Sequence, residues 1–228
     1  MAVAFDAVSE KLDDAPAGSS SWSHTCSGAQ RCLLVFLSIH TNTFSCQATA
    51  VTYNGVSLTS LNTGHVEFAV RTELWRLTGP ASGANTIAVT WDNGTDDVHR
   101  ISHGISYTGV DQTTPNRTVQ SGTGTDGAPT LTYTNSQAGD TVVAHMGDDN
   151  GWYDVSSGTQ RAKNQVGDFP NVYGSIAEKT NGTSVTISWS KVWGSDYWRI
   201  ISVGLVPGAA AGSPPPRRSR AMRHMLVR

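Results

Sequence analysis

Residues 51–115 constrain the fold of this chain most strongly, because short apolar and β-branched runs alternate there with tight turns. The segment contains the dipeptide Asn54-Gly55, a Gly/Pro-rich turn over residues 80–85, and an alternating apolar run over residues 86–91. Asn-Gly favours a two-residue hairpin, because both residues accept a positive φ. No helical periodicity interrupts the segment. The pattern predicts an all-β protein built from antiparallel strands.

Strand signals of the same kind continue to residue 205 and predict about fourteen strands, with turn residues between them. Residues 31–39 are almost continuously apolar, which predicts a central strand buried on both faces. Only 15% of the residues are charged and 23 are glycine, a composition typical of β-sandwiches. We therefore predict one large antiparallel β-sandwich, jelly-roll-like, over residues 1–207.

Two short segments resemble each other, namely residues 51–56 and residues 105–110. The similarity covers six residues and does not recur at a fixed period. We interpret it as two strands that meet similar turns, and not as a repeat architecture. Residues 122–128 and 147–158 are predicted to be loops, the first because of its Gly and Thr content.

Charge is unevenly distributed along the chain. The formal net charge is −2, which argues against a nucleic-acid-binding protein. Residues 208–228 form a linker rich in Gly, Ala and Pro, followed by a basic arm without acidic residues. This arm is either a disordered end or a segment that docks on the acidic surface of a neighbouring subunit. The candidate docking residues are Arg217, Arg218, Arg220, Arg223, Met225 and Leu226.

The run at 51–56, the run from Leu74 to Trp91 and the run from Ser106 to Pro115 together resemble a known β-sandwich family. That family occurs in structural proteins of tailed phages and in surface proteins of environmental bacteria, and the resemblance covers about residues 30–205. It implies a non-enzymatic virion component, with a capsid decoration (cement) protein as the first expectation. The implied partners are the major capsid protein or another virion protein, and two further copies of the chain in a homotrimer. Assembly would take place in the host cytoplasm.

One acidic and aromatic segment predicts a contact with a ligand or a partner. Carboxylates and an amide stand next to aromatic rings, which is the chemistry of saccharide sites and also of protein contacts. The candidate residues are Asp148, Asp149, Asn150, Trp152 and Tyr153. The alternative function is therefore a carbohydrate-binding module, or a tail or head-fibre adhesin for host surface glycans. Trp22, Trp152 and Trp193 fall at strand ends or in loops, where core packing explains them less easily.

Catalytic and metal-binding patterns are weak. His99 and His103 are four residues apart, and on a strand their side chains would stand ~13 Å apart, too far to share an ion. Residues 92–97 are rich in oxygen ligands but lack the 12-residue Ca²⁺ loop and its terminal Glu. No Gly-x-Ser-x-Gly, His-Glu-x-x-His or P-loop motif is present. We predict no enzymatic activity, cofactor or metal.

The three cysteines have no metal-ligand spacing. We expect Cys26, Cys32 and Cys46 to be buried and reduced, with a Cys26–Cys46 or a Cys32–Cys46 bridge as the alternatives. The first residues lack a basic segment followed by an apolar one, so no secretory signal peptide is predicted. No apolar run approaches the ~20 residues of a membrane-spanning helix.

Overall fold

A computed structural model describes residues 1–15, 17–41, 46–62, 70–92, 98–125, 127–167, 171–180, 182–194 and 197–209. The described residues form strands and no helix. The strands are β1 (Ala4–Asp13), β2 (Ser19–Cys26), β3 (Cys32–Thr41), β4 (Ala48–Tyr53), β5 (Val56–Ser57), β6 (Thr59–Asn62), β7 (Val70–Thr78), β8 (Gly83–Trp91), β9 (Val98–Thr108), β10 (Gln120–Thr125), β11 (Thr130–Tyr133), β12 (Thr141–Asp149), β13 (Trp152–Ser157), β14 (Thr159–Val166), β15 (Val172–Thr180), β16 (Val185–Trp193) and β17 (Tyr197–Leu205). The all-β prediction is confirmed.

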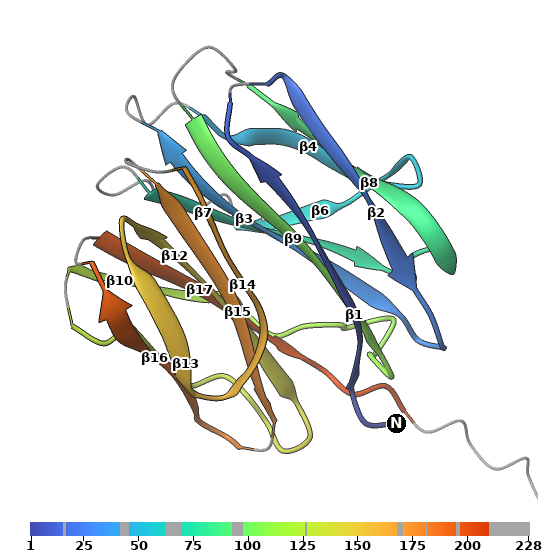
Figure 1. Ribbon diagram of the computed structural model, residues 1–228. Coiled ribbons are helices and arrows are strands. Elements are labelled where there is room, and N and C mark those ends of the chain that lie inside the picture. The colour runs from blue at the N-terminus through green and yellow to red at the C-terminus, as the bar shows by residue number, and fades with distance from the viewer. Residues whose placement is uncertain are drawn as a thin grey trace, which may run out of the picture.

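These strands build four antiparallel sheets, two in each half of the chain (Figure 1). The N-terminal half contains the sheet β1-β9-β3-β7-β6 and the sheet β2-β8-β4-β5. In these sheets β1 pairs with β9, β2 with β8, β3 with β7 and β4 with β5. Such nested pairing across two packed sheets is the jelly-roll arrangement. The N-terminal half is therefore a complete jelly roll.

The C-terminal half repeats this arrangement, except that none of its described strands takes the place of β5. Its larger sheet is β10-β17-β12-β15-β14 and its smaller sheet is β11-β16-β13. β10 pairs with β17, β11 with β16, and β12 with β15, as β1, β2 and β3 pair with β9, β8 and β7 in the first half. The predicted antiparallel, jelly-roll-like β-sandwich architecture is confirmed, and the sheets follow the same strand order in both halves of the chain. In this repeated strand order β9 is equivalent to β17. The short sequence similarity between residues 51–56 and residues 105–110 does not join equivalent strands.

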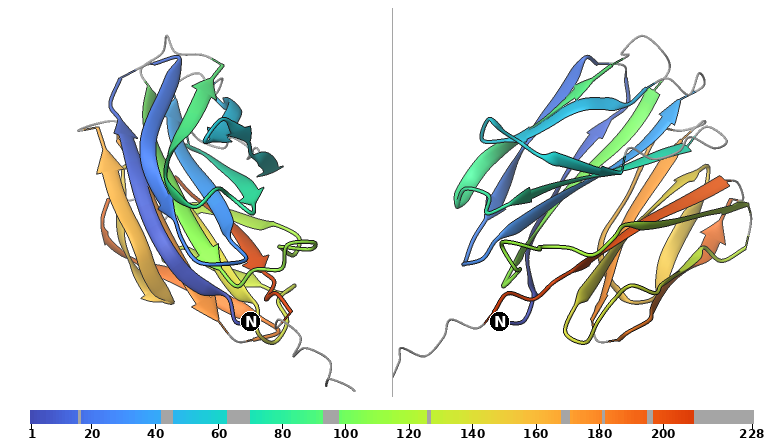
Figure 2. Two further views of the ribbon diagram at one scale, coloured as in Figure 1. Left: turned by 90° about the vertical axis from the view of Figure 1, so that its right-hand side faces the viewer. Right: turned by 180° about the vertical axis from the view of Figure 1, so that it is seen from behind.

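The two larger sheets pack face to face, so that four layers follow one another through the molecule (Figure 2). One apolar core lies inside each jelly roll, and a third lies between the two larger sheets. β3 contributes Leu33 and Val35 to the core of the first jelly roll, and Leu34 and Phe36 to the core between the jelly rolls. The prediction that residues 31–39 form a strand buried on both faces is confirmed, and the four layers are its physical reason.

Two predicted loops are wrong. β10 occupies most of residues 122–128, because the glycines there lie against large side chains; a Cβ on Gly124 would come within 2.3 Å of the Trp198 ring. Residues 147–158 form the end of β12, a short turn at Asn150-Gly151, and β13. Asn150 has a φ of 67°, which asparagine tolerates better than most residues. This Asn-Gly turn leads the chain from one sheet to the other, because β12 and β13 are not paired, whereas Asn54-Gly55 closes the predicted hairpin of β4 and β5.

Candidate functional site

β8 and β16 are equivalent strands, yet β16 continues further. Both carry alternating inward apolar residues that end in a buried tryptophan, Trp91 in β8 and Trp189 in β16. β8 ends at Trp91, whereas β16 continues for four residues to Trp193. The partner of Trp91 is the first residue of β4, while the partner of Trp189 is Val155, the fourth residue of β13. Among the described residues, the β13–β16 pair of the C-terminal jelly roll therefore extends further beyond its tryptophan than the β4–β8 pair of the N-terminal one.

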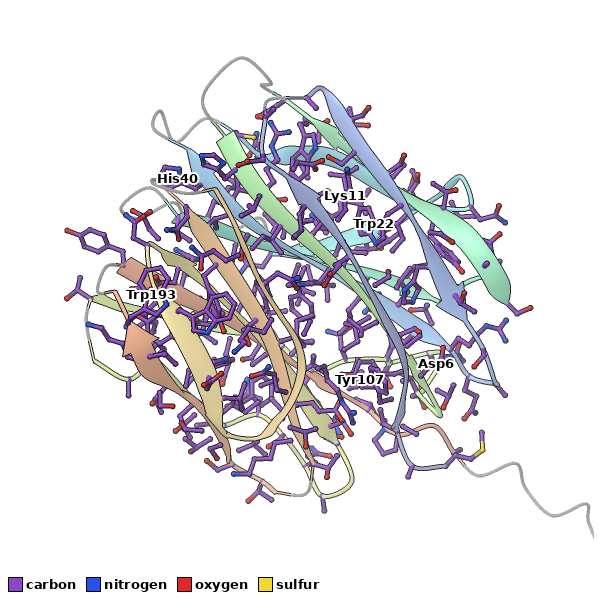
Figure 3. All side chains as sticks on the ribbon, in the orientation of Figure 1. Asp6, Lys11, Trp22, His40, Tyr107 and Trp193 are labelled. Carbon is purple, nitrogen blue, oxygen red and sulfur yellow. The ribbon has the colours of Figure 1, made fainter. Side chains whose placement is uncertain are left out.

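The extension brings two tryptophans together as cross-strand partners, Trp152 at the start of β13 and Trp193 at the end of β16. Trp193 is 49% exposed and Val192, its neighbour in the sequence, is 54% exposed. Both side chains therefore reach solvent. Trp193 lies at the outer end of the C-terminal jelly roll (Figure 3). We call Trp152, Asp154, Lys163, Val192 and Trp193 the Trp152–Trp193 patch.

Trp152 is held from two sides. Its ring meets the ring of Tyr173 edge-on at 5.5 Å between centroids, and the Lys163 ammonium lies 4.5 Å from the indole centroid. Lys163 also pairs with Asp154, with 2.6 Å between Nζ and Oδ1. Because Lys163 comes from β14 and Asp154 from β13, the pair ties the two strands together beside the indole. The patch thus places a carboxylate and an ammonium next to an aromatic face.

Beneath the patch, Tyr173 is buried, and burial raises the pKa of its phenol well above 10. Its hydroxyl donates a hydrogen bond of 2.5 Å to the Tyr153 carbonyl oxygen. Gly194 follows Trp193 with a φ of 79°, and a Cβ there would lie 2.1 Å from the Asn150 carbonyl oxygen. This close approach fixes the end of β16 against the Asn150-Gly151 turn, so the two tryptophans stand on a rigid base.

Only part of the predicted contact segment reaches the surface. Asp148 and Tyr153 are fully buried, because β-strand alternation turns them inward. Asp149 lies 3.4 Å from His40, and the Asn150 side chain accepts a hydrogen bond of 3.2 Å from the Asn171 amide. Of the five predicted residues, Trp152 is the one that joins the patch.

The sequence identified Trp193 as unexplained by core packing but did not connect it to Trp152. Core packing does involve the other two tryptophans. The Trp22 Nε1 donates a hydrogen bond of 3.0 Å to Ser9, and its ring packs against the N-terminal core, while Trp152 packs against the C-terminal core. The signal that could have found the site is the length of residues 185–193, which continue in extended form beyond the pattern shared with β8.

The predicted docking arm, Arg217, Arg218, Arg220, Arg223, Met225 and Leu226, lies outside the described residues, as does most of the oxygen-rich turn at residues 92–97. His99 and His103 are both on β9 and contact different partners, His99 with Asp14 and His103 with Asn164. Within the described ranges, no three His, Cys, Asp or Glu side chains are grouped to hold a metal ion.

The three cysteines are buried and free. Burial raises the pKa of the Cys32 thiol to about 12, and it also raises the pKa of Cys26 and of Cys46. None of the three is bridged to another in the structure, and their raised pKa values keep the thiols protonated and unreactive near neutral pH.

None of the family models, curated proteins or solved structures compared with this chain matches it. The described part of the chain holds no helix that is long and apolar enough to cross a membrane. The fold and the Trp152–Trp193 patch are therefore the basis for a functional proposal.

Proposed function

We propose that the protein is a non-enzymatic virion structural protein that recognises surface glycans through the Trp152–Trp193 patch. The resemblance of residues 30–205 to phage structural proteins supports the virion part of this proposal. The observation that carries the binding part is the exposure of Trp193, the cross-strand partner of Trp152, whose own ring lies against the Lys163–Asp154 pair. Indole faces stack on the C–H faces of sugar rings, while a carboxylate and an ammonium hydrogen-bond to hydroxyl groups.

The size of the patch favours a small polar ligand over a broad protein contact. A stable protein interface buries about 800 Å² on each partner and has an apolar centre. Among the described residues, the large hydrophobic side chains exposed in the C-terminal jelly roll are Val192 and Trp193. Two such side chains do not form the centre of a standard protein interface, whereas one exposed indole offers a face on which a sugar ring can stack.

The test is a glycan array probed with three forms of the full chain: wild type, Trp193→Ala and Val56→Ala. Val56 is the control, because at 54% its exposure is close to the 49% of Trp193, but it lies in the N-terminal jelly roll. We expect wild type and Val56→Ala to bind the same glycans, and Trp193→Ala to lose about 5- to 30-fold in affinity, since one stacked aromatic contributes on the order of 1–2 kcal/mol. No binding by wild type, or equal binding by Trp193→Ala, would contradict the proposal.

A second candidate, the capsid decoration protein, has one observation in its favour. The Met1 amine donates a hydrogen bond to the Gly208 carbonyl oxygen, and the Gly208 amide bonds the Gly109 carbonyl oxygen at 2.8 Å. These bonds fix Gly208, the residue at which the predicted linker to the basic arm begins. The arm would then pair with acidic side chains of the major capsid protein, with the decoration protein as a homotrimer.

Co-sedimentation with capsids distinguishes the two candidates. For a decoration protein, wild type should co-sediment in a fixed ratio to the capsid protein, deletion of residues 209–228 should release it, and light scattering should give a trimer. For the glycan-binding candidate, deletion of the arm should leave glycan binding unchanged.

A further inference from the structure

Two histidines meet where the larger sheets of the two jelly rolls pack together. His103 comes from β9 in the first jelly roll and His145 from β12 in the second; both are fully buried. Their ring centroids lie 5.6 Å apart in an edge-to-face arrangement, and the His145 ring also stacks on Phe36 at 5.3 Å. At this end of the interface the two imidazoles lie beside the small apolar cluster of Ile101, Val166 and Val172, while the rest of the interface is mainly apolar.

Each imidazole bonds a neutral side chain of the opposite jelly roll. His145 Nε2 lies 2.7 Å from the Ser38 hydroxyl on β3, and His103 Nε2 lies 2.8 Å from the Asn164 amide oxygen on β14. The Nδ1 atom of both rings is buried without a hydrogen-bond partner. A proton added at Nδ1 would therefore place a charge in a site that offers it no acceptor. We call His103, His145, Ser38 and Asn164 the histidine joint.

The sheets approach closely at this joint. A Cβ on Gly147 would come within 2.6 Å of the Ser38 hydroxyl, and a Cβ on Gly174 would come within 3.3 Å of both imidazole rings. Water has no room to solvate an imidazolium there while the two sheets stay in contact. Burial is the main reason that the pKa of His103 is lowered and that the pKa of His145 lies well below 6.5.

Other charged groups surround the joint but do not bond to it. Glu10 on β1 is the strand partner of His103 and favours its charged form by its field alone. His40 and Asp149 contact each other across the interface, His99 pairs with Asp14, and Arg199 is the strand partner of Gly147. At the opposite end of the interface, Tyr107 donates to Glu178, which is paired with Arg161. None of these acids hydrogen-bonds to His103 or His145.

We propose that the histidine joint is an acid-sensitive contact, and that its protonation separates the two jelly rolls while each keeps its own core. Each jelly roll has a separate apolar core that does not include the joint. In the separated state both imidazoles would be hydrated and would titrate near their ordinary pKa of about 6.5. Because the closed state binds fewer protons than the open one, closure is favoured above about pH 6.5 and weakens as the pH falls.

The cysteines of the chain report on this separation. Cys32 belongs to the core between the jelly rolls, whereas Cys26 and Cys46 belong to the core of the first jelly roll. The experiment measures the rate at which each thiol of the full chain reacts with dithiodipyridine, resolved by peptide mass spectrometry. The rates of Cys26 and Cys46 serve as internal controls for reagent chemistry and for global unfolding.

Between about pH 7.5 and about pH 5.5, we expect the labelling of Cys32 relative to Cys26 and Cys46 to rise about tenfold if one histidine takes a proton, and about a hundredfold if both do. A constant ratio would overturn the proposal, whether all three rates rise together or none changes. The double variant His103→Gln and His145→Gln should make the ratio independent of pH. If that variant does not fold, the ratio measured on wild type decides the question alone.

Discussion

The two jelly rolls share a strand order but differ in the length of the strand that precedes the last one, β8 in the first and β16 in the second. In both, the strand before the last carries an alternating run that ends in a buried tryptophan, Trp91 in one and Trp189 in the other. The Trp91 indole donates 2.8 Å to Ser20 on a neighbouring strand of its own jelly roll, and the Trp189 indole donates 3.1 Å to Ser175. In the second jelly roll the strand continues to Trp193, which is half exposed. The buried tryptophans at equivalent positions stabilise the two cores. The additional residues of β16 carry the proposed binding site.

The largest expected effect tests the shared positions. Trp189→Ala and Trp91→Ala should each destabilise the protein by about 3–5 kcal/mol, because each removes a buried indole from a core. Urea unfolding followed by circular dichroism measures both. Since the larger sheets share a buried interface at neutral pH, each variant should unfold in one transition. Two separate transitions at pH 7 would show that the jelly rolls are independent there.

The contact between the jelly rolls is tested by Gly147→Ala. The added methyl group would lie 2.6 Å from the Ser38 hydroxyl and 2.8 Å from the Thr72 methyl group, so the facing sheets must move apart. We expect a loss of about 1–3 kcal/mol in the free energy of unfolding. Gly18→Ala is the control, because no atom lies within 4 Å of the added methyl group. Equal stability of the two variants would contradict the close packing of the sheets.

The N-terminal core should also respond to acid. Burial lowers the pKa of His24 from 6.5 to about 4, and the nearby Asp6 only partly offsets this effect. The stability that His24 contributes in its neutral form is present above about pH 6.5 and is lost as the pH falls toward 4, a change of at most about 3 kcal/mol. Urea titrations of wild type and His24→Asn at several pH values measure it. A variant with the same pH dependence as wild type would rule out this role of His24.

The smallest expected effect on stability concerns Trp193, at the end of β16, and it tests whether this residue serves packing or binding. Trp193→Ala should change the free energy of unfolding by less than about 1 kcal/mol, because half of the side chain is already in water. Trp189→Ala, four residues earlier on the same strand, should cost several times more. Differential scanning calorimetry of both variants measures the contrast. A large loss on Trp193→Ala would identify Trp193 as a packing residue and remove the support for a binding role.

The sequence predicted the strands well, because alternation and turn dipeptides are local signals. The central position of β3 followed from its continuous apolar run. The duplication was missed, because many apolar side chains satisfy the same buried position and little sequence identity survives between the halves. The clearest shared segment is residues 101–105 (Ile-Ser-His-Gly-Ile) against residues 201–205 (Ile-Ser-Val-Gly-Leu), a similarity too short to recognise without the paired strands.

For the site, the sequence identified the right aromatic residues but not their arrangement. Trp152 was predicted as a contact residue, and Trp193 was noted as unexplained by packing, yet their pairing depends on a register shift next to Trp152. Asp148 and Tyr153 were predicted beside Trp152 but point inward, since a shift of one residue along a strand reverses the face that a side chain occupies. Register of this kind is set by long-range pairing and cannot be read from a single segment.

The central claim is that the strand extension of the C-terminal jelly roll binds saccharides, and the indole signals of the full chain test it most directly. The seven tryptophans give seven indole N–H resonances in a ¹⁵N-labelled sample. On titration with hexoses and N-acetylhexosamines, we predict that the signals of Trp152 and Trp193 shift, while those of Trp22, Trp75, Trp91 and Trp189 stay in place. Shifts confined to the N-terminal jelly roll, or no shift with any of these sugars, would contradict the account.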